Sequence, residues 1–444
     1  MNDMNALYPQ ANAVLARLRQ QLDSVTQALA QQCSIGNTLD AVRLDQLQLP
    51  SYDLALAAAE LLAAETALLQ TTASAVAAER RLALTCAADA VFAVADRLQS
   101  IAASLDGVEL ADIAGSAEAQ ALRRAVLSAQ ALDETGRAVL ACGGEVGHIA
   151  LDDELAMAQE QFRRLARDLV APLAEKIHRH DLIVPEELLQ PLREMGVFGL
   201  SIPERFGGSA PDERDDNLMM IVVTEALSEA SLAAAGSLIT RPEILSRALL
   251  TGGTEEQKQH WLPRIAAGEP LCGIAITEPD YGSDVASLQL RGSRCDGGWL
   301  LNGAKTWCTF AGKAGLIMAV VRTSPDKSLG YKGLSILLVE KPSYEGHDFA
   351  YVQPKGGGRL SGRAIPTIGY RGMHSFDLAF ENFFVPDANV IGGEGGLGKG
   401  FYFTMAGMMG GRLQTAARAS GIMRAALLAA LGYEAYQRLA SHDA

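Results

Sequence analysis

Apolar and polar residues recur with a helical period over the first 150 residues, which are rich in alanine and leucine and nearly free of proline. Residues 53–105 form a continuous helical pattern, with Ser51 or Asp53 as the expected N-cap. A further helix is predicted over residues 117–140, where two consecutive glycines follow and end the pattern. Residues 1–150 are therefore predicted to form a helical bundle or hairpin.

Residues 151–270 keep the helical period and predict a second helical domain. Thr254 is placed to cap the last of its helices, and Gly268 to close it. The segment 202–208 lies between two apolar-periodic stretches and predicts a loop. The helices are expected at residues 152–174, 186–195, 217–235, 242–250 and 255–267.

Residues 271–391 change to short apolar runs that are typical of strands. Asn302-Gly303 predicts a hairpin turn, and the glycine-rich segment 343–363 predicts a surface excursion. The strands are expected at residues 271–277, 299–301, 316–321, 334–339 and 376–385. A long helix follows at about 401–431, so the order of elements predicts an α+β fold with a central antiparallel β domain.

The bulk composition excludes several classes of protein. The 444 residues carry a formal net charge of −14, which disfavours a nucleic-acid-binding protein. The six cysteines form no Cys-x-x-Cys pair, so no metal site of that type is expected. The thiols are expected to be reduced. The start shows no signal-peptide pattern and the apolar stretches contain charges, so a cytoplasmic protein without a membrane span is expected.

Three sequence blocks suggest a ligand site. They are ITEPDYGSDV at residues 276–285, LNGAKTWCT at 301–309 and GYRGMHS at 369–375. A flavin requires a flat apolar slot with hydrogen bonds along its polar edge. Trp307 offers a broad face and Thr309 a hydroxyl, and strand alternation places the two side chains on one side.

In these blocks and their order, residues 151–430 resemble the acyl-CoA dehydrogenase family. The resemblance implies an FAD site in which Trp307 and Thr309 contact the flavin ring. It also implies that Thr277 and the backbone of Ile276 meet the pyrimidine edge, and that Ser283 meets the flavin phosphate or the CoA chain.

The resemblance implies that Arg412 lies beside the acyl-CoA. It also implies three successive regions: a helical extension at 1–150, an N-terminal domain at 151–270 and a middle β domain at 271–391. The implied reaction is α,β-dehydrogenation, in which a carboxylate removes the α proton and the β hydride passes to the flavin. Reduced flavin would pass its electrons to an electron-transfer flavoprotein, and the complete protein is expected to be a homo-oligomer.

Within the family, the long extension and the glycine-rich insertion are most similar to methylsuccinyl-CoA dehydrogenases. The expected substrate is therefore a short branched or carboxylated acyl-CoA, with another short acyl-CoA as the alternative. A free carboxylate on the substrate requires a fixed guanidinium. Arg241, Arg363 and Arg371 are the candidates, and the sequence does not choose among them.

The chain departs from the family pattern at its C-terminal part. Residues 392–444 correspond to a remnant of the family's C-terminal helical bundle, most of which is missing, together with the usual catalytic Glu. Gly411 stands where some members carry an alternative base. Three hypotheses follow: a truncated and impaired dehydrogenase, a non-catalytic flavin- or acyl-CoA-binding or assembly protein, and an enzyme whose base comes from a partner chain.

Overall fold

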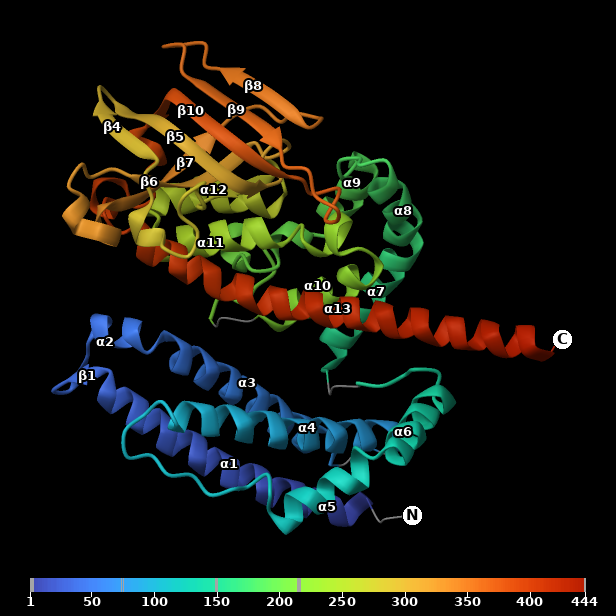
Figure 1. Cartoon of the computed structure of the whole chain (residues 1–444). Coiled ribbons are helices and arrows are strands. Elements are labelled where there is room, and N and C mark those ends of the chain that lie inside the picture. Colours follow the sequence, from blue (N-terminus) through green and yellow to red (C-terminus); the bar gives the residue numbers. More distant parts are fainter. Residues whose placement is uncertain (1–3, 73, 75, 148–150, 214–216, 443–444) are drawn as a thin grey trace. The chain divides into compact units, whose positions relative to one another are not determined.

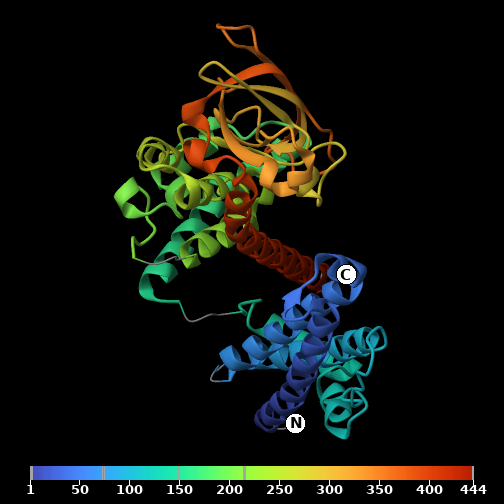
Figure 2. The same ribbon diagram turned by 90° about the vertical axis from the view of Figure 1, so that its left-hand side faces the viewer.

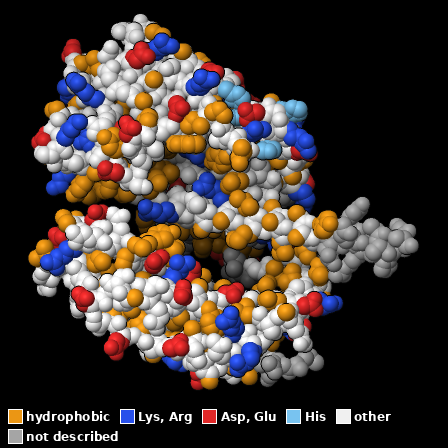
Figure 3. Space-filling view, viewed as in Figure 1, with side chains coloured by type: hydrophobic (Ala, Val, Ile, Leu, Met, Phe, Trp, Pro, Cys, Tyr) orange, Lys and Arg blue, Asp and Glu red, His pale blue; other side chains and the backbone are white. Residues whose placement is uncertain are grey.

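The computed structural model describes residues 4–72, 74, 76–147, 151–213 and 217–442. The backbone divides into two compact units, one of residues 1–150 with 430–444 and one of residues 151–429. The described residues form mainly helices, with an eight-stranded sheet and a short two-stranded one, as the α+β prediction required (Figure 1). On the face drawn in Figure 3, acidic and basic side chains are interspersed.

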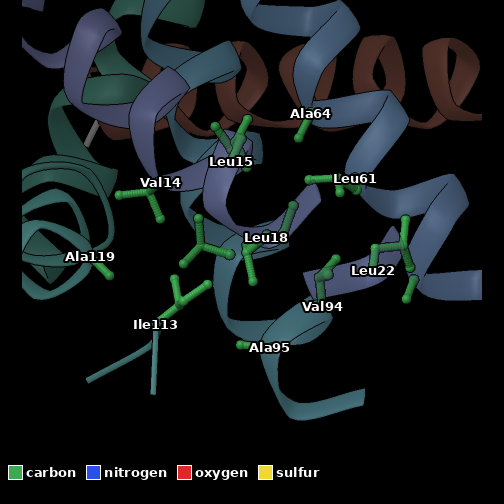
Figure 4. Close-up of a cluster of buried hydrophobic side chains, with 14 of the residues drawn as sticks. Val14, Leu15, Leu18, Leu22, Leu61, Ala64, Val94, Ala95, Ile113 and Ala119 are labelled. Atoms are coloured by element: carbon green, nitrogen blue, oxygen red, sulfur yellow. The ribbon is translucent and has the colours of Figure 1, made fainter. Parts of the chain in front are cut away.

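The first unit is a helical bundle with a short two-stranded hairpin. Its elements are α1 (Met4–Gln32), β1 (Ser34–Ile35), β2 (Thr38–Leu39), α2 (Ala41–Gln46), α3 (Gln48–Thr71), α4 (Ala77–Ala102), α5 (Ala117–Val126) and α6 (Ala129–Ala141). Leucine, alanine and valine side chains from α1, α3, α4 and α5 fill most of its core, among them Leu18, Leu61 and Val94 (Figure 4). The predicted bundle is confirmed.

Two helix boundaries in this unit differ from the sequence prediction. The helical pattern at 53–105 is two helices, because the chain breaks between α3 and α4, and both expected N-caps lie inside α3. The predicted helix at 117–140 is also two, because the Ser128 hydroxyl accepts a hydrogen bond from Ala131 N and starts α6. Apolar periodicity continues through both breaks, which is why it did not reveal them.

By length and composition, α3 is the one described helix that could cross a membrane. The core helix of a globular unit meets the same criteria. Four side chains of α3 are buried in the bundle core: Ala57, Leu61, Ala64 and Leu68.

The helices of the second unit agree closely with the predicted ranges. They are α7 (Asp153–Leu165), α8 (Ala171–Arg179), α9 (Glu186–Glu194), α10 (Leu218–Ala230), α11 (Thr240–Gly252) and α12 (Glu255–Ala266). A π-helical stretch, Ala166–Val170, joins α7 to α8, and another, Leu232–Gly236, follows α10. Thr254 and Gln257 form the capping box of α12.

An eight-stranded sheet packs against α11 and α12 (Figures 1 and 2). Its strands are β3 (Cys272–Ala275), β4 (Arg291–Cys295), β5 (Gly298–Thr309), β6 (Leu316–Arg322), β7 (Leu334–Glu340), β8 (Asp348–Val352), β9 (Arg359–Ala364) and β10 (Ser375–Pro386). The order is β3-β6-β4-β5-β10-β9-β8, with β7 on β6. Pairing is antiparallel except where β6 meets β3 and β4.

Strand β6 shows why this part of the sequence is uniformly apolar. Leu316, Met318 and Val320 belong to the core shared with α11 and α12, whereas Ile317 and Ala319 belong to the core on the opposite face. Because both faces are covered, the strand has no solvent-facing position.

Two strand predictions are wrong. Asn302-Gly303 makes no hairpin turn, since both residues lie inside β5 beside an irregularity in its pairing with β10. The turn is Asp296-Gly297, which joins β4 to β5 with Cys295 opposite Gly298.

The segment 343–363 contains the hairpin of β8 and β9 and is not only a surface excursion. Strand β8 lies at the sheet edge, where alternating exposure hides the apolar signal of a strand.

The final helix, α13 (Gly400–His442), passes along α10 and α11 within the second unit (Figure 1). Glycines make the close approach possible, since a Cβ at Gly421 would lie 2.5 Å from the Glu225 carbonyl oxygen. The apolar side chains of this helix are only partly buried: Ala417 is buried, whereas Leu413 is exposed.

Candidate functional site

A buried ion pair joins the first two sequence blocks. Lys305 Nζ in β5 lies 2.8 Å from Glu278 Oε1 and donates to the Ile276 carbonyl at 2.7 Å. The two side chains are 0% and 5% exposed. The backbone N–H group of Gln289 donates to Glu278 Oε2 at 2.6 Å, and that of Leu290 donates to Oε1 at 2.7 Å.

This network satisfies both buried charges, which is the condition for a buried pair to persist. Burial lowers the pKa of Lys305, and the adjacent Glu278 carboxylate opposes that shift. We call Glu278 and Lys305 the clamp, because the pair fixes the loop after β3 against β5. Sequence reasoning gave neither residue a role, although a lysine within an apolar strand was a usable signal.

The strand beside the clamp ends in strained backbone. Trp307 has φ 56° and Phe310 has φ 66°, both in the left-handed region that bulky residues rarely adopt. The pairing of β5 with β10 shifts register next to Trp307. Such strain persists only where the surroundings hold it, and it gathers at ligand sites.

Trp307 is 56% exposed, whereas Trp261 and Trp299 are core residues. The thiol of Cys308 beside it is buried, which raises its pKa to about 12 and leaves it unreactive. The strand therefore buries position 308 and leaves a large aromatic face at 307 open to a ligand.

Thr309 is half-buried, and its hydroxyl lies 2.8 Å from the Ser375 hydroxyl at the start of β10. Phe310 N donates to the His374 carbonyl at 2.7 Å. These two bonds attach the end of β5 to the third sequence block, residues 369–375. All three blocks therefore meet at one end of β5. A single ligand site built from the three blocks requires this proximity.

The remaining predicted cofactor residues lie in the loop after β3. Ile276 and Thr277 are half-buried, and the Thr277 carbonyl accepts a hydrogen bond from Thr306 N at 2.9 Å. Ser283 is exposed in the following loop. A hollow of about 580 Å³ adjoins this region and is lined by residues that include Pro279, Lys305 and Thr306.

On α13, Arg412 is exposed and its guanidinium reaches Met409 Sδ at 3.3 Å. Gly411 is buried, and a Cβ built there would contact Ile244 Cδ1 at 3.4 Å, an ordinary contact distance. A Cβ at position 411 is therefore sterically feasible.

The third block is anchored through Asp181. The Asp181 carboxylate accepts a hydrogen bond from His374 Nε2 at 2.9 Å, with Arg371 Nε at 3.4 Å and His347 Nε2 at 3.7 Å. Burial alone would raise the pKa of Asp181, but the hydrogen bond from His374 and the interactions with His347 and Arg371 outweigh it and hold the pKa below the usual value of an aspartate.

The three candidate arginines have different surroundings. Arg363 is 85% exposed and lies 3.8 Å from Asp348. Arg371 contacts Asp181. Arg241 is half-buried in the first turn of α11, and among the described residues its hydrogen-bond partners, the Ser237 carbonyl and the Tyr370 hydroxyl, are both neutral.

Comparison with known proteins identifies two family domains. Residues 152–269 match the acyl-CoA dehydrogenase N-terminal domain, and residues 273–383 match the middle domain of the same family.

The chain is 40% identical to (2S)-methylsuccinyl-CoA dehydrogenase of Cereibacter sphaeroides over 311 residues, which cover 70% of this chain and 53% of that protein. It is 33% identical to an acyl-CoA dehydrogenase of Bacillus subtilis, covering 63% of this chain and 68% of that protein. The chain thus spans about half the length of the first relative.

Among solved structures, a glutaryl-CoA dehydrogenase in complex with glutaryl-CoA superposes with a TM-score of 0.56. It is 29% identical, over 65% of this chain and 68% of that one.

Proposed function

We propose that this chain, which belongs to the acyl-CoA dehydrogenase family, provides a site for FAD-dependent α,β-dehydrogenation of a short branched or carboxylated acyl-CoA of the methylsuccinyl-CoA type. The observation that carries this proposal is the exposed Trp307 on strained backbone, held at the meeting point of the three sequence blocks.

The residues at this point fit a flavin. Trp307 offers an exposed aromatic face, and the half-buried Thr277 and Thr309 offer hydroxyls for a polar ring edge. The clamp holds the residues on either side of Thr277, because Lys305 binds the Ile276 carbonyl and the Glu278 carboxylate. The Thr277 hydroxyl is therefore preorganised for a ligand. When bound, FAD supplies the acceptor for the hydride that leaves the β carbon.

The chain's own residues would bind and orient the thioester. Ser283 is exposed and free to meet a phosphate or the CoA chain, and Arg412 is exposed on α13 beside position 411. Removal of the weakly acidic α proton requires a positioned base, which contributes about a hundred- to ten-thousandfold to rate. Gly411 cannot provide one, so we propose that turnover at this site is impaired.

The proposal includes the setting of the reaction. Electrons would leave to an electron-transfer flavoprotein, the complete protein would form a homo-oligomer, and the location would be cytoplasmic. The first two of these statements rest on the family.

A second candidate function is a non-catalytic FAD- and acyl-CoA-binding protein. The observation that favours it is again Gly411, since the site lacks a side chain where some relatives are expected to carry the base. The two candidates differ in whether any enoyl-CoA forms.

The test uses the full chain loaded with FAD, mixed without oxygen with methylsuccinyl-CoA and an artificial electron acceptor. Mass spectrometry measures the unsaturated thioester. We expect slow formation that rises about a hundredfold or more in Gly411→Glu, with Gly411→Ala as the matched control that stays slow. Complete absence of product in the wild type and in Gly411→Glu, with FAD bound, would leave the binding-only function.

A further inference from the structure

Two guanidinium groups converge on one tyrosine in the second unit. Arg241 Nη2 lies 3.3 Å from the Tyr370 hydroxyl, and Arg241 Nη1 donates to the Ser237 carbonyl at 2.8 Å. Arg418 on α13 reaches the same place, donating from Nη1 to the Ser237 hydroxyl at 3.1 Å and from Nη2 to the Thr415 hydroxyl at 2.8 Å. We call Arg241, Arg418 and Tyr370 the arginine cluster.

In the part of the chain that the structure describes, neither arginine of this cluster forms an ion pair. The other guanidiniums near α10 and α13 contrast with this: Arg163 and Arg424 both lie close to Glu229. Two half-buried cations that face one another and bind only neutral groups are unfavourable unless an anion joins them.

The electrostatics of the three groups agree with this geometry. Burial lowers the pKa of Arg418, and the charge of Arg241 lowers it further, while the adjacent Tyr370 opposes the shift. Burial opposes ionisation of Tyr370, but the two guanidiniums and the Ser237 hydrogen bond outweigh it and lower its pKa. The cluster thus stabilises negative charge at its centre.

The backbone around the cluster adds to the positive potential. Arg241 lies in the first turn of α11, where the unpaired N–H groups of a helix favour an anion. Beside it, the Thr240 hydroxyl is buried without a hydrogen-bond partner among the described residues.

The cluster also adjoins the proposed reaction site. Arg418 follows Gly411 by seven residues on α13, which is two helical turns and therefore the same side of the helix. Tyr370 packs in the hydrophobic cluster that contains Phe310, one residue beyond Thr309. An acyl group that runs from position 411 along this side of α13 towards its C-terminal end would therefore approach the Arg418 side chain.

We infer that the arginine cluster is a carboxylate subsite, and that the substrate is an acyl-CoA whose acyl chain ends in a free carboxylate. A carboxylate between Arg241 and Arg418 would accept charge-assisted hydrogen bonds from both guanidiniums, and a further one from the Tyr370 hydroxyl. This inference rests on the proposed function and selects the dicarboxylic substrates within it. It also chooses Arg241 over Arg363 and Arg371, which the sequence left equal.

The test measures binding of two thioesters to the FAD-loaded full chain by isothermal titration calorimetry. Succinyl-CoA and butyryl-CoA have acyl chains of equal length, and the terminal carboxylate of the first replaces the methyl group of the second. We expect the wild type to bind succinyl-CoA more tightly. Arg418→Gln and Arg241→Gln should each weaken succinyl-CoA binding about ten- to a hundredfold and leave butyryl-CoA binding unchanged.

Two further variants sharpen the result. Arg418→Lys keeps the charge and loses the two-pronged geometry, so it should restore part of the succinyl-CoA affinity. Arg363→Gln is the control, because it removes an exposed arginine, and it should change neither affinity.

Equal affinity of the wild type for both thioesters would overturn the inference while leaving the proposed function intact. Parallel loss of both affinities in the glutamine variants would also overturn it, since it would show a structural role for the arginines. Failure of the wild type to bind either thioester would refute the proposed function, and the subsite with it.

Discussion

The clamp gives the sharpest quantitative prediction. Lys305→Met preserves the length and apolar stem of the side chain and removes the charge, which leaves the Glu278 carboxylate buried with only its two backbone donors. Removing one partner of a buried ion pair costs about 3–5 kcal/mol of unfolding free energy. The two remaining hydrogen bonds compensate part of the loss, so we expect about 3 kcal/mol.

Tryptophan fluorescence is the suitable probe for this variant. All three tryptophans, Trp261, Trp299 and Trp307, lie in the second unit, so their thermal transition reports on that unit and not on the helical bundle. For a unit of this size, about 3 kcal/mol corresponds to a fall in Tm of roughly 6–12 °C. FAD binding should weaken as well, because the clamp holds the loop that carries Thr277.

Lys313→Met is the matched control. Lys313 is as buried as Lys305, with 2% of its side chain exposed, but its partners Glu186 and Glu345 are 57% and 70% exposed. These carboxylates return to water when the lysine is lost, so the cost should stay below about 1 kcal/mol. Equal destabilisation by the two substitutions, or none by Lys305→Met, would refute the reasoning. Lys305→Met combined with Glu278→Gln should be more stable than Lys305→Met alone.

Two other predictions concern the flavin site and pH. Trp307→Ala should raise the Kd for FAD about tenfold, and Thr309→Val should also raise it. Trp299→Ala is the control and should raise the Kd less than either when the three variants are compared at equal loss of stability. An equal rise in Kd for all three would mean that only core residues were found. Asp181→Asn should be less stable than the wild type at neutral pH, because the lowered pKa of Asp181 and its hydrogen bond from His374 contribute stability above the usual pKa of an aspartate. That difference in Tm should close as pH falls through the lowered pKa, and a difference independent of pH would contradict the assignment.

The sequence was sufficient for the order of helical regions, β domain and final helix, and for locating the three blocks that meet at the end of β5. Those blocks lie at strand ends, where apolar runs give way to polar turns, and this pattern is local. The capping box of α12 was recoverable for the same reason, since Thr254 and Gln257 are three residues apart.

Features that depend on pairing between distant segments were not predictable. Asn302-Gly303 carries the local signal of a hairpin, yet the pairing of β5 with β10 continues through it. Strand alternation also gave no sign that Trp307 has a left-handed backbone, since the register shift depends on β10.

The arginine cluster has no local signature at all. Arg241, Tyr370 and Arg418 come from α11, the loop before β10 and α13, and only the packed unit brings them together. Whether a guanidinium is available to bind a substrate carboxylate depends on its partners in the fold. Among the residues that the structure describes, Arg363 and Arg371 each lie near an aspartate, whereas Arg241 does not, and the sequence gave no sign of this difference.

The central claim is that the end of β5 binds a flavin and places it beside an acyl-CoA site. The most direct measurement is a titration of the flavin-free full chain with FAD, followed by its fluorescence, and then by addition of succinyl-CoA. We predict a stoichiometric plateau with quenched flavin fluorescence, and a spectral change of the bound flavin on adding the thioester that coenzyme A alone does not cause. Absence of saturable FAD binding, or a bound flavin that does not respond to the thioester, would contradict the account.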